Sequence, residues 1–302
     1  MTDRGVSLRR AALRRFLRRP SNLVSVVFLV LVVIAALWPT SWLPHDPTAS
    51  DLAARLRPPA WLDGGSWSYV LGTDNIGRDV FSRIVLGSRW SLVISGTAVV
   101  IAAVLGITAG VIAGYRGGWV DSITMRAVDV QLAFPVIILV IAVVGVVGTG
   151  ITQLILVMGV TGWAQYARIV RGSTLSIRNQ DYVEAAVAQG ASAWRIMTRD
   201  ILPNLASEII VLTSFNMARL LLLESGLSFL GLGIQPPRPS WGGMVGDARD
   251  YLQSGWWILA FAGGTIALAV LSFNFLGDGI RDALDPRTRH VGTAQSAEEA
   301  AS

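Results

Sequence analysis

The chain has 302 residues, of which 52% are hydrophobic and only 15% are charged. Soluble domains carry about 25% charged residues, so this composition excludes an ordinary soluble protein. It predicts an all-α membrane protein. Cysteine and lysine are both absent, which excludes disulfides, thiolate metal sites and the lysine of a Walker A phosphate loop. The net charge of +5 comes from arginines beside apolar segments, a pattern typical of membrane topology signals and not of nucleic-acid binding.

The N-terminal region combines a basic tail with an apolar segment. Residues 1–20 form the tail, which contains seven arginines and a single acidic residue. The apolar segment Leu23–Trp38 follows directly, so the excess of arginine predicts a cytoplasmic N-terminus. A cleavable signal peptide would need small residues after this segment, and Leu37-Trp38-Pro39-Thr40 does not provide them. We therefore predict an uncleaved first span at the start of a region, 21–90, that continues as a long extracytoplasmic loop.

Charged residues close this loop in a turn-rich stretch. Asp74, Arg78 and Asp79 are near enough in sequence to pair locally and hold the loop compact. The next segment, Phe81–Trp90, alternates apolar and basic residues at roughly helical spacing. This alternation predicts a helix that lies along the membrane surface.

Five further apolar segments predict a membrane core over residues 91–280. They are Leu92–Gly114, Met125–Val147, Leu154–Val170, Leu205–Leu230 and Trp257–Leu276. The first carries Gly106, Gly110 and Gly114 at four-residue intervals, which predicts close helix packing and, as a less favoured alternative, a glycine-lined substrate path. Pro135 predicts a kink in the second segment.

Six spans place both termini on the same side of the membrane. In this topology 17 arginines lie in cytoplasmic segments, 7 lie outside and 1 lies within a span, in agreement with the positive-inside rule. The tail 281–302 is then cytoplasmic, and its small polar residues from Thr288 onward predict disorder.

The segment Leu205–Leu230 carries three charged residues, Glu208, Arg219 and Glu224. A charge at mid-bilayer costs about 2.5 to 3.5 kcal/mol even on a lenient insertion scale, so Arg219 should face the helix bundle or a watery cavity. We predict that Arg219 and Glu224 line a transport pathway. A buried ion pair that holds helices together is an equal alternative, and the partner of Arg219 is either Glu224 or a carboxylate on another span or chain.

A polar stretch, 178–203, separates two of the apolar segments. Asp181 and Glu184 have the spacing of a capping box at the start of a short helix. Gly190 is predicted to end this helix, because glycine adopts a left-handed backbone at little cost. The stretch therefore begins as a short helix that stops at a glycine.

A second short helix is predicted after Gly190. Ser192 can cap it, and Trp194, Met197 and Ile201 would share one side. Because proline disfavours helical geometry in the preceding residue, this helix should stop near Leu202, with Pro203 in the first turn of a new one.

The spacing of Glu184-Ala185-Ala186, Gly190 and Leu202-Pro203 resembles the EAA loop of ABC importer permeases. Asp200 departs from that pattern, since such loops usually carry an apolar residue or histidine there. The stretches 71–79, 224–242 and 273–287 resemble the dipeptide, oligopeptide and nickel importer permeases, most closely the C-type dipeptide/oligopeptide permease. Together these motifs extend over nearly the whole chain.

This resemblance implies six transmembrane helices in a binding-protein-dependent ABC importer permease fold, in the inner membrane of a bacterium. Glu184, Ala185, Ala186, Gly190, Leu202 and Pro203 would couple the chain to two cytoplasmic ATPase subunits. The ATPases would bind ATP and magnesium, whereas this chain would hold no cofactor or metal and would not itself be catalytic. Its other partners would be a homologous second permease, an extracytoplasmic solute-binding protein and the lipid bilayer, with no nucleic acid.

The predicted function is import of di- or oligopeptides by alternating access. Nickel chelates, opines, glutathione and oligosaccharides are alternative cargoes with the same fold and mechanism. An ion-coupled secondary transporter that uses Arg219, Glu224 and Glu208 is less favoured because it leaves the coupling loop unexplained. A membrane-embedded hydrolase is remote, because the chain has no HExxH motif and both histidines, His45 and His290, lie outside the predicted spans.

Overall fold

The computed structural model describes residue 16 and residues 19–284. All regular elements within this part of the chain are helices. Most of the predicted basic tail and the stretch from Thr288 onward lie outside the described residues.

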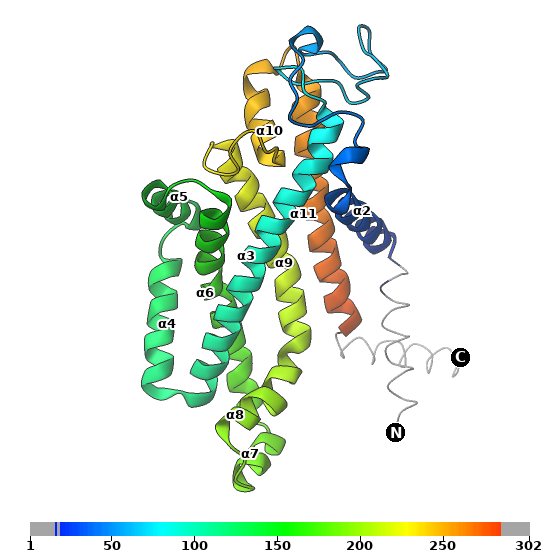
Figure 1. Ribbon diagram of the computed structural model, residues 1–302. Helices are drawn as coiled ribbons and strands as arrows, with labels where there is room; N and C mark the ends of the chain where they lie inside the picture. Colours follow the sequence, from blue (N-terminus) through cyan, green and yellow to red (C-terminus); the bar gives the residue numbers. More distant parts are fainter. Residues whose placement is uncertain (1–15, 17–18, 285–302) are drawn as a thin grey trace, which may run out of the picture.

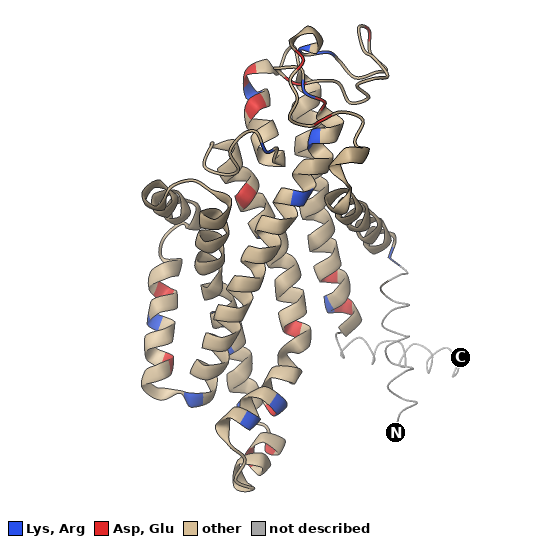
Figure 2. Ribbon diagram, viewed as in Figure 1, with Lys and Arg blue, Asp and Glu red and all other residues tan. Residues whose placement is uncertain are grey.

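The long helices form an elongated bundle along one axis, to which only α2 lies at a marked angle (Figure 1). They are α2 (Pro20–Leu37), α3 (Val80–Arg116), α4 (Gly118–Leu132), α6 (Ile151–Arg178), α9 (Leu202–Phe229) and α11 (Trp256–Leu284). At one end, here called the tip end, lie α7 (Asp181–Ala188) and α8 (Ala193–Arg195). At the other, the loop end, lie residues 38–79 and α10 (Trp241–Ala248). Charged residues gather toward these two ends and along α4 (Figure 2).

Four helical segments among the described residues are long and apolar enough to cross a membrane. They are Pro20–Leu37, Val80–Arg116, Ala193–Phe229 and Trp256–Leu284. The count rises to five if α4 and α5 (Val136–Val147) together form one span. The prediction of an all-helical membrane protein is therefore confirmed.

Three glycines bring α3 and α6 into backbone contact, as their spacing predicts. A Cβ atom added to Gly106 would lie 2.4 Å from the Trp163 carbonyl oxygen. At Gly110 it would lie 2.7 Å from the Ala167 carbonyl oxygen, and at Gly114 2.8 Å from the Thr174 Cβ atom. Because no side chain fits in these gaps, glycine is what permits the close approach.

The bend predicted at Pro135, within the segment 125–147, is present and is sharper than expected. The chain bends by 88° between α4 and α5, which is a break and not a kink. Pro135, at the N-cap of α5, has no N–H to donate, and it disfavours helical geometry in the residue before it. With only 12 residues, α5 is about 18 Å long, too short to cross a bilayer by itself.

Polar contacts hold α4 against α6. The Arg171 guanidinium donates from Nε to Asp121 Oδ1 at 2.9 Å, and Arg168 pairs with Asp129. The Trp163 indole donates to Gln131 Oε1 at 2.6 Å. Only Val128 is buried among the residues of α4, so these contacts secure a helix that has almost no core of its own.

The start of α3 also differs from expectation. Phe81–Trp90 was predicted to lie along the membrane surface, but it forms the first turns of α3, which begins at Val80. The Asp79 carboxylate caps this helix by accepting from the Ser82 N–H at 2.9 Å. Arg83 is buried and donates to the Pro47 carbonyl oxygen, and Arg89 donates from Nε to the Ala36 carbonyl oxygen at 2.7 Å. Both basic residues of this segment therefore bind groups of the protein itself.

The predicted local pairing in the loop is confirmed for Asp74 and Arg78, whose Oδ2 and Nε atoms lie 2.6 Å apart. Two indoles attach the loop end to the bundle. Trp257 donates to the Thr73 carbonyl oxygen, and Trp241 donates to the Ile84 carbonyl oxygen, each at 3.0 Å.

We expect the Gly106→Ala substitution to lower the thermal unfolding midpoint of the detergent-solubilised protein. The new methyl group would meet the α6 backbone at 2.4 Å, and overpacking of this kind costs about 1 to 3 kcal/mol. Gly96→Ala is the matched control on the same helix, because nothing lies within 4 Å of a Cβ atom there. Equal stability of the two proteins would contradict the close packing of α3 on α6.

Candidate functional site

The polar stretch between α6 and α9 projects beyond the bundle and forms its tip (Figure 1). It folds as a short helix, a glycine turn and a second short helix, in the predicted order. We call this segment, 179–203, the tip segment.

Gly190 ends α7 as predicted, with a positive φ of 77°. The Gly190 N–H donates to the Val187 carbonyl oxygen at 2.9 Å, and the Ala191 N–H donates to the Ala186 carbonyl oxygen at 3.1 Å. These two bonds form a Schellman motif, which satisfies carbonyl groups at the end of a helix. The turn between the two short helices is therefore set by the backbone of one glycine.

The predicted capping box at the start of α7 is wrong. Gln180 is the N-cap, without a side-chain capping bond, and Asp181 is already the first helical residue. The Gln180 carbonyl oxygen instead accepts from the N–H groups of Val183 and Glu184. The Glu184 side chain is consequently exposed on the helix surface instead of folding back onto its own backbone. The predicted cap of α8 is confirmed, since Ser192 Oγ accepts from the Arg195 N–H.

The second helix does not stop at Leu202. A π-helical stretch, Ile196–Ile201, joins α8 directly to α9, so that the chain is helical from Ala193 to Phe229. A proline ring clashes with the carbonyl group four residues earlier, which for Pro203 belongs to Arg199. Arg199 lies within the widened π turns, which relieve this clash, and the helix passes the proline without a break.

A buried apolar cluster anchors the tip segment to the bundle. The tip segment contributes four residues to it, and the start of α9 contributes one more. These five pack against one residue of α3 and one of α6. The members are Val183, Ile196, Met197, Ile201, Leu205 of α9, Val111 of α3 and Val170 of α6. Met197 and Ile201 share this buried side as predicted. Trp194 does not, because 73% of its surface is exposed.

The tip segment exposes large apolar side chains together with charged residues, among them Glu184. Tyr182, Val187 and Trp194 are its exposed large apolar or aromatic residues, and Glu184 and Ala185 are also exposed. We call these five residues the tip surface. Exposed apolar groups gathered in one place indicate an interaction site, and the small Ala185 lets another protein approach.

The remaining predicted coupling residues lie close by. Ala186 is half-buried behind the tip surface, whereas Leu202 and Pro203 are exposed where α9 begins. Beside Glu184 lies a hollow of about 560 Å³ that Arg116 and Arg178 also line. Glu184 and Val187 of the tip surface therefore both border a hollow that two arginines also line.

The structure separates the two predicted pathway residues. Arg219 is exposed on α9, and its Nη1 donates to Gln165 Oε1 of α6. Glu224 is buried, and its Oε1 accepts from Ser228 Oγ at 2.7 Å. Among the described residues Arg219 forms no ion pair with Glu224, so of the two alternatives for its partner the pair on one helix is not the arrangement found.

Sequence reasoning missed Gln165 as the partner of Arg219, because it searched for a carboxylate. The amide within an otherwise apolar stretch of α6 was the available signal. Glu208, the third charged residue of this helix, is exposed and lines a hollow of about 410 Å³ together with Arg281.

This fold and tip match a known class of membrane protein. The family model described as the inner membrane component of binding-protein-dependent transport systems matches residues 106–290. A model for the N-terminal transmembrane domain of oligopeptide transport permease C matches residues 7–59. The chain belongs to this family of inner-membrane permeases, in its C-type oligopeptide and dipeptide branch, and it is the permease component and not an enzyme.

Relatives cover nearly the full length. The chain is 38% identical over 276 residues to a di/tripeptide transport system permease protein of Pseudomonas aeruginosa, covering 91% of each chain. It is 40% identical over 276 residues to a glutathione transport system permease protein of Pectobacterium atrosepticum, covering 91% of this chain and 90% of the relative. A dipeptide transport system permease protein of Haemophilus influenzae is 36% identical over 274 residues, covering 91% of this chain and 93% of the relative.

Among solved structures, the MetNI methionine ABC transporter in an inward-facing conformation contains a chain with the same fold. The TM-score is 0.56 at 19% identity, and the match covers 67% of this chain and 97% of that one. At this identity the likeness concerns the fold alone.

We expect Gly190→Ala to loosen the tip segment. Alanine disfavours the left-handed backbone by about 1 to 2 kcal/mol, although nothing lies within 4 Å of its added Cβ atom. Hydrogen exchange of the α7 amides should therefore become faster. Gly172→Ala on α6 is the control, with equally open surroundings and an ordinary helical backbone. Unchanged exchange in the Gly190→Ala protein would contradict this role of the glycine.

Proposed function

We propose that the chain imports di- or oligopeptides as one permease subunit of an ATP-driven transporter. The observation that carries this proposal is the tip surface, which presents Glu184 and Ala185 among exposed apolar side chains at the end of a span. Relatives whose printed names include dipeptides, tripeptides and glutathione support the cargo class. Glutathione is itself a tripeptide-like molecule, so peptide cargo is the common element.

We propose six spans, formed by α2, α3, the bent pair α4 and α5, α6, α9 and α11. The helix α6 is long enough, since 28 residues extend over about 42 Å. Its polar residues Gln153, Thr161 and Gln165 lower its hydropathy. Two of these side chains bond within the protein: the Thr161 hydroxyl donates to the Val157 carbonyl oxygen at 2.8 Å, and the Gln165 amide oxygen accepts from Arg219. A span shielded by other helices can carry such residues.

This topology puts both termini and the tip end in the cytoplasm and the loop end outside. It divides the chain into a basic tail (1–20), a first span with a long outer loop (21–90), a five-span core (91–280) that includes the coupling loop 178–203, and a C-terminal tail (281–302). The arginine excess of the predicted cytoplasmic segments supports this orientation.

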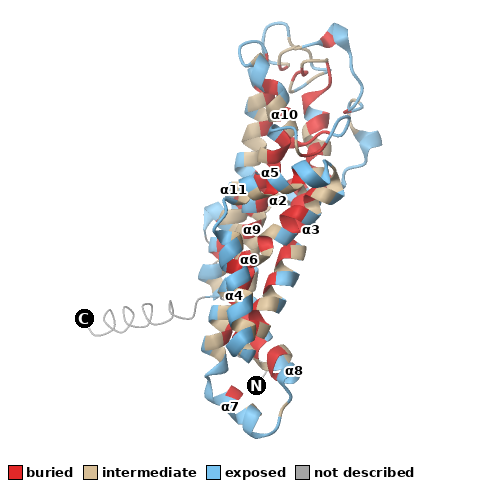
Figure 3. Ribbon diagram, turned by 90° about the vertical axis from the view of Figure 1, so that its left-hand side faces the viewer, coloured by how far each residue is buried: buried red, intermediate tan, exposed pale blue. Residues whose placement is uncertain are grey.

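The proposed partners are two ATPase subunits at the tip, a solute-binding protein at the loop end and a homologous second permease. Glu184, Ala185, Ala186, Gly190, Leu202 and Pro203 would form the contact with an ATPase subunit, which would bind ATP and magnesium. Support for the second permease comes from α4, which is largely exposed (Figure 3). It carries an exposed arginine, Arg126, and a charge within a span needs cover from protein.

The proposed mechanism is alternating access driven from the tip. Closure of the ATPases on ATP would pull the tip segments of the two permeases together and open the bundle to the outside. Because α8, the π-helical stretch and α9 form one helix, movement of the tip would be passed directly to α9. Hydrolysis would return the bundle to its inward-open state.

Two alternatives differ from this proposal in cargo or in energy source. Nickel chelates, opines and oligosaccharides would use the same mechanism with another binding protein. An ion-coupled transporter with Arg219, Glu224 and Glu208 as a relay finds less support. Arg219 is bonded to an amide and Glu224 to a hydroxyl, and the tip surface would have no role.

We expect Glu184→Lys to abolish ATP-dependent uptake of a mixed di- and oligopeptide pool into vesicles that contain the assembled complex. The substitution reverses the only charge of the tip surface, where it would meet the ATPase. Asp63→Lys is the matched control, because it reverses an exposed charge in the loop at the opposite end.

Full uptake by the Glu184→Lys complex would contradict the coupling role. Uptake that survives without ATP but is lost on dissipation of the ion gradients would instead favour the ion-coupled transporter. If neither the wild type nor the control takes up peptides, the peptide cargo is contradicted, and the other cargoes come next.

We also propose that Arg219 lines the pathway, and expect Arg219→Met to reduce uptake at least tenfold while the thermal stability of the complex stays the same. Gln165→Leu, which removes the bonded partner, serves for comparison. A purely structural role predicts that both substitutions lower stability, whereas a pathway role predicts loss of uptake for Arg219→Met without loss of stability. Transport by the Arg219→Met complex at the wild-type rate would refute the pathway role.

A further inference from the structure

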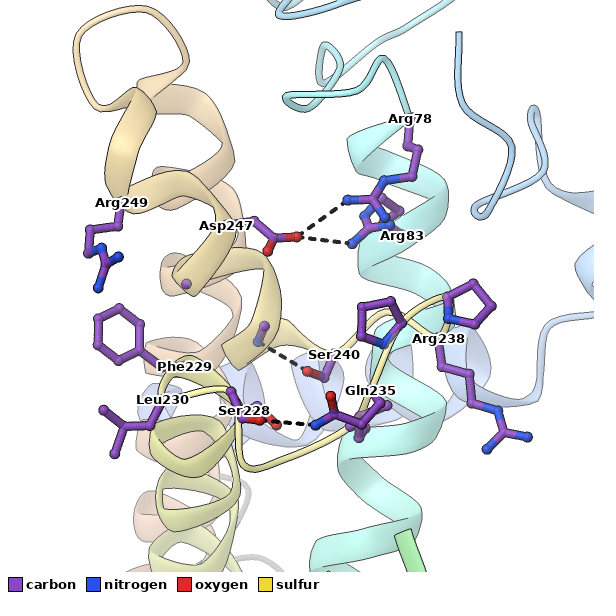
Figure 4. A pocket seen from close by; sticks show the side chains of 16 residues that line it. Arg78, Arg83, Ser228, Phe229, Leu230, Gln235, Arg238, Ser240, Asp247 and Arg249 are labelled. Carbon is purple, nitrogen blue, oxygen red and sulfur yellow. Dashed lines mark hydrogen bonds and ion pairs between the residues drawn. The ribbon is translucent and has the colours of Figure 1, made fainter. Parts of the chain in front are cut away.

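A cavity of about 440 Å³ opens at the loop end between α10, the start of α3 and the segment 231–240 (Figure 4). Its wall contains four arginines and one carboxylate: Arg78, Arg83, Arg238, Arg249 and Asp247. Its volume is typical of small-molecule sites. Arg249 is paired with Asp250, so we consider Arg78 and Arg83 as the arginines that could meet a ligand.

Two of these arginines are buried. Arg78 lies just before α3 and its side chain is 10% exposed, and Arg83 lies in the first turn of α3 and its side chain is 5% exposed. Arg78 is firmly paired, because its Nε lies 2.6 Å from Asp74 Oδ2. Arg83 Nε lies 3.4 Å from the same oxygen and has no hydrogen-bond partner among the described residues. A buried guanidinium with an unused donor favours a further acceptor, since leaving such a group unpaired is costly.

Asp247 on α10 faces both guanidinium groups (Figure 4). Its Oδ2 lies 3.3 Å from an Arg78 nitrogen and 3.7 Å from an Arg83 nitrogen. Strong pairs between arginine and carboxylate have distances of about 2.7 to 2.9 Å. Asp247 is also 47% exposed, so it is a loosely held carboxylate at the edge of the cavity.

We propose that this cavity binds the free C-terminal carboxylate of the peptide cargo as it enters from the outer side. Arg83 and Arg78 provide the guanidinium groups, and the cargo carboxylate takes the place that Asp247 holds when no cargo is present. This inference rests on the proposed peptide import and adds a carboxylate-recognition step at the outer end of the permease.

The position of the arginines favours a small cargo over the surface of a partner protein. The guanidinium groups lie inside the cavity wall, which a peptide terminus can enter and a flat protein surface cannot. Arg238 also lines the cavity, but its guanidinium lies 4.9 Å from the centre of the Trp90 ring and points away from Asp247 (Figure 4). The cavity thus offers an anion one incompletely paired arginine, Arg83.

The test uses the complete complex of permeases and ATPases in nanodiscs, without binding protein. It measures the binding of radiolabelled tri-alanine to this complex. Unlabelled tri-alanine and tri-alanine amide then compete with the label, which gives the affinity for the acid and for the amide. We expect the wild type to bind the acid roughly tenfold more tightly than the amide. Asp247→Asn removes the competing carboxylate and should tighten binding of the acid several-fold, with no change for the amide. Arg83→Gln should weaken binding of the acid roughly tenfold and leave the amide unchanged.

Arg55→Gln is the matched control, because it removes a positive charge from the same end of the molecule without lining the cavity. Its affinity for both peptides should equal that of the wild type. If the Arg83→Gln complex fails to assemble, the opposite sign expected for Asp247→Asn still decides the question, since damage to the fold would not tighten binding.

Three outcomes would each overturn the proposal. The wild type could bind acid and amide equally well, or it could fail to bind tri-alanine at all. The Asp247→Asn complex could bind the acid as weakly as the wild type or more weakly. A change only in the affinity of the binding protein for the Asp247→Asn complex would show that the cavity takes a carboxylate of that protein, and would also overturn it. ATP-dependent uptake of tri-alanine with binding protein present tests the proposed import separately. Uptake without carboxylate recognition refutes this inference alone, and absence of uptake refutes the import.

Discussion

The close approach of α3 to α6 is the constraint on which the rest of the molecule depends. Gly106 and Gly110 let the two backbones meet without side chains between them. With α6 fixed there, its ion pairs hold α4 in place, its amide reaches Arg219 on α9, and its end leads into the tip segment. A membrane offers little hydrophobic driving force between helices, so such direct packing contributes much of the cohesion.

The features that sequence predicted well are those set by local chemistry. The glycine spacing on α3, the left-handed Gly190 and the cap at Ser192 each depend on a few neighbouring residues. Four of the six predicted spans form helices that are long and apolar enough to cross a bilayer, and length and hydropathy are local properties of the sequence. The predicted coupling residues were recognised as a motif, and all of them except the half-buried Ala186 are exposed at one end of the molecule.

The features that sequence missed depend on partners that are distant in the chain. The pairing of Arg219 with Gln165 and the approach of Asp247 to Arg83 join residues on different helices. The two prolines differ from expectation in opposite ways. Pro135 was expected to kink a helix and stands at a bend of 88°, whereas Pro203 was expected to separate two helices and lies within a continuous one. Proline removes one hydrogen bond in either case, and tertiary packing decides how the chain responds.

The π-helical join also has a mechanical consequence. From Ala193 to Phe229 the chain is a single stiff lever of 37 residues, about 55 Å long. A hinge at Pro203 would have absorbed a push on Trp194 within a few residues. In the lever, a tilt of roughly 5° about one end swings the other by about 5 Å. The segment 231–240 follows shortly after α9, so in the proposed mechanism the mouth of the arginine cavity would move with the far end of the same helix.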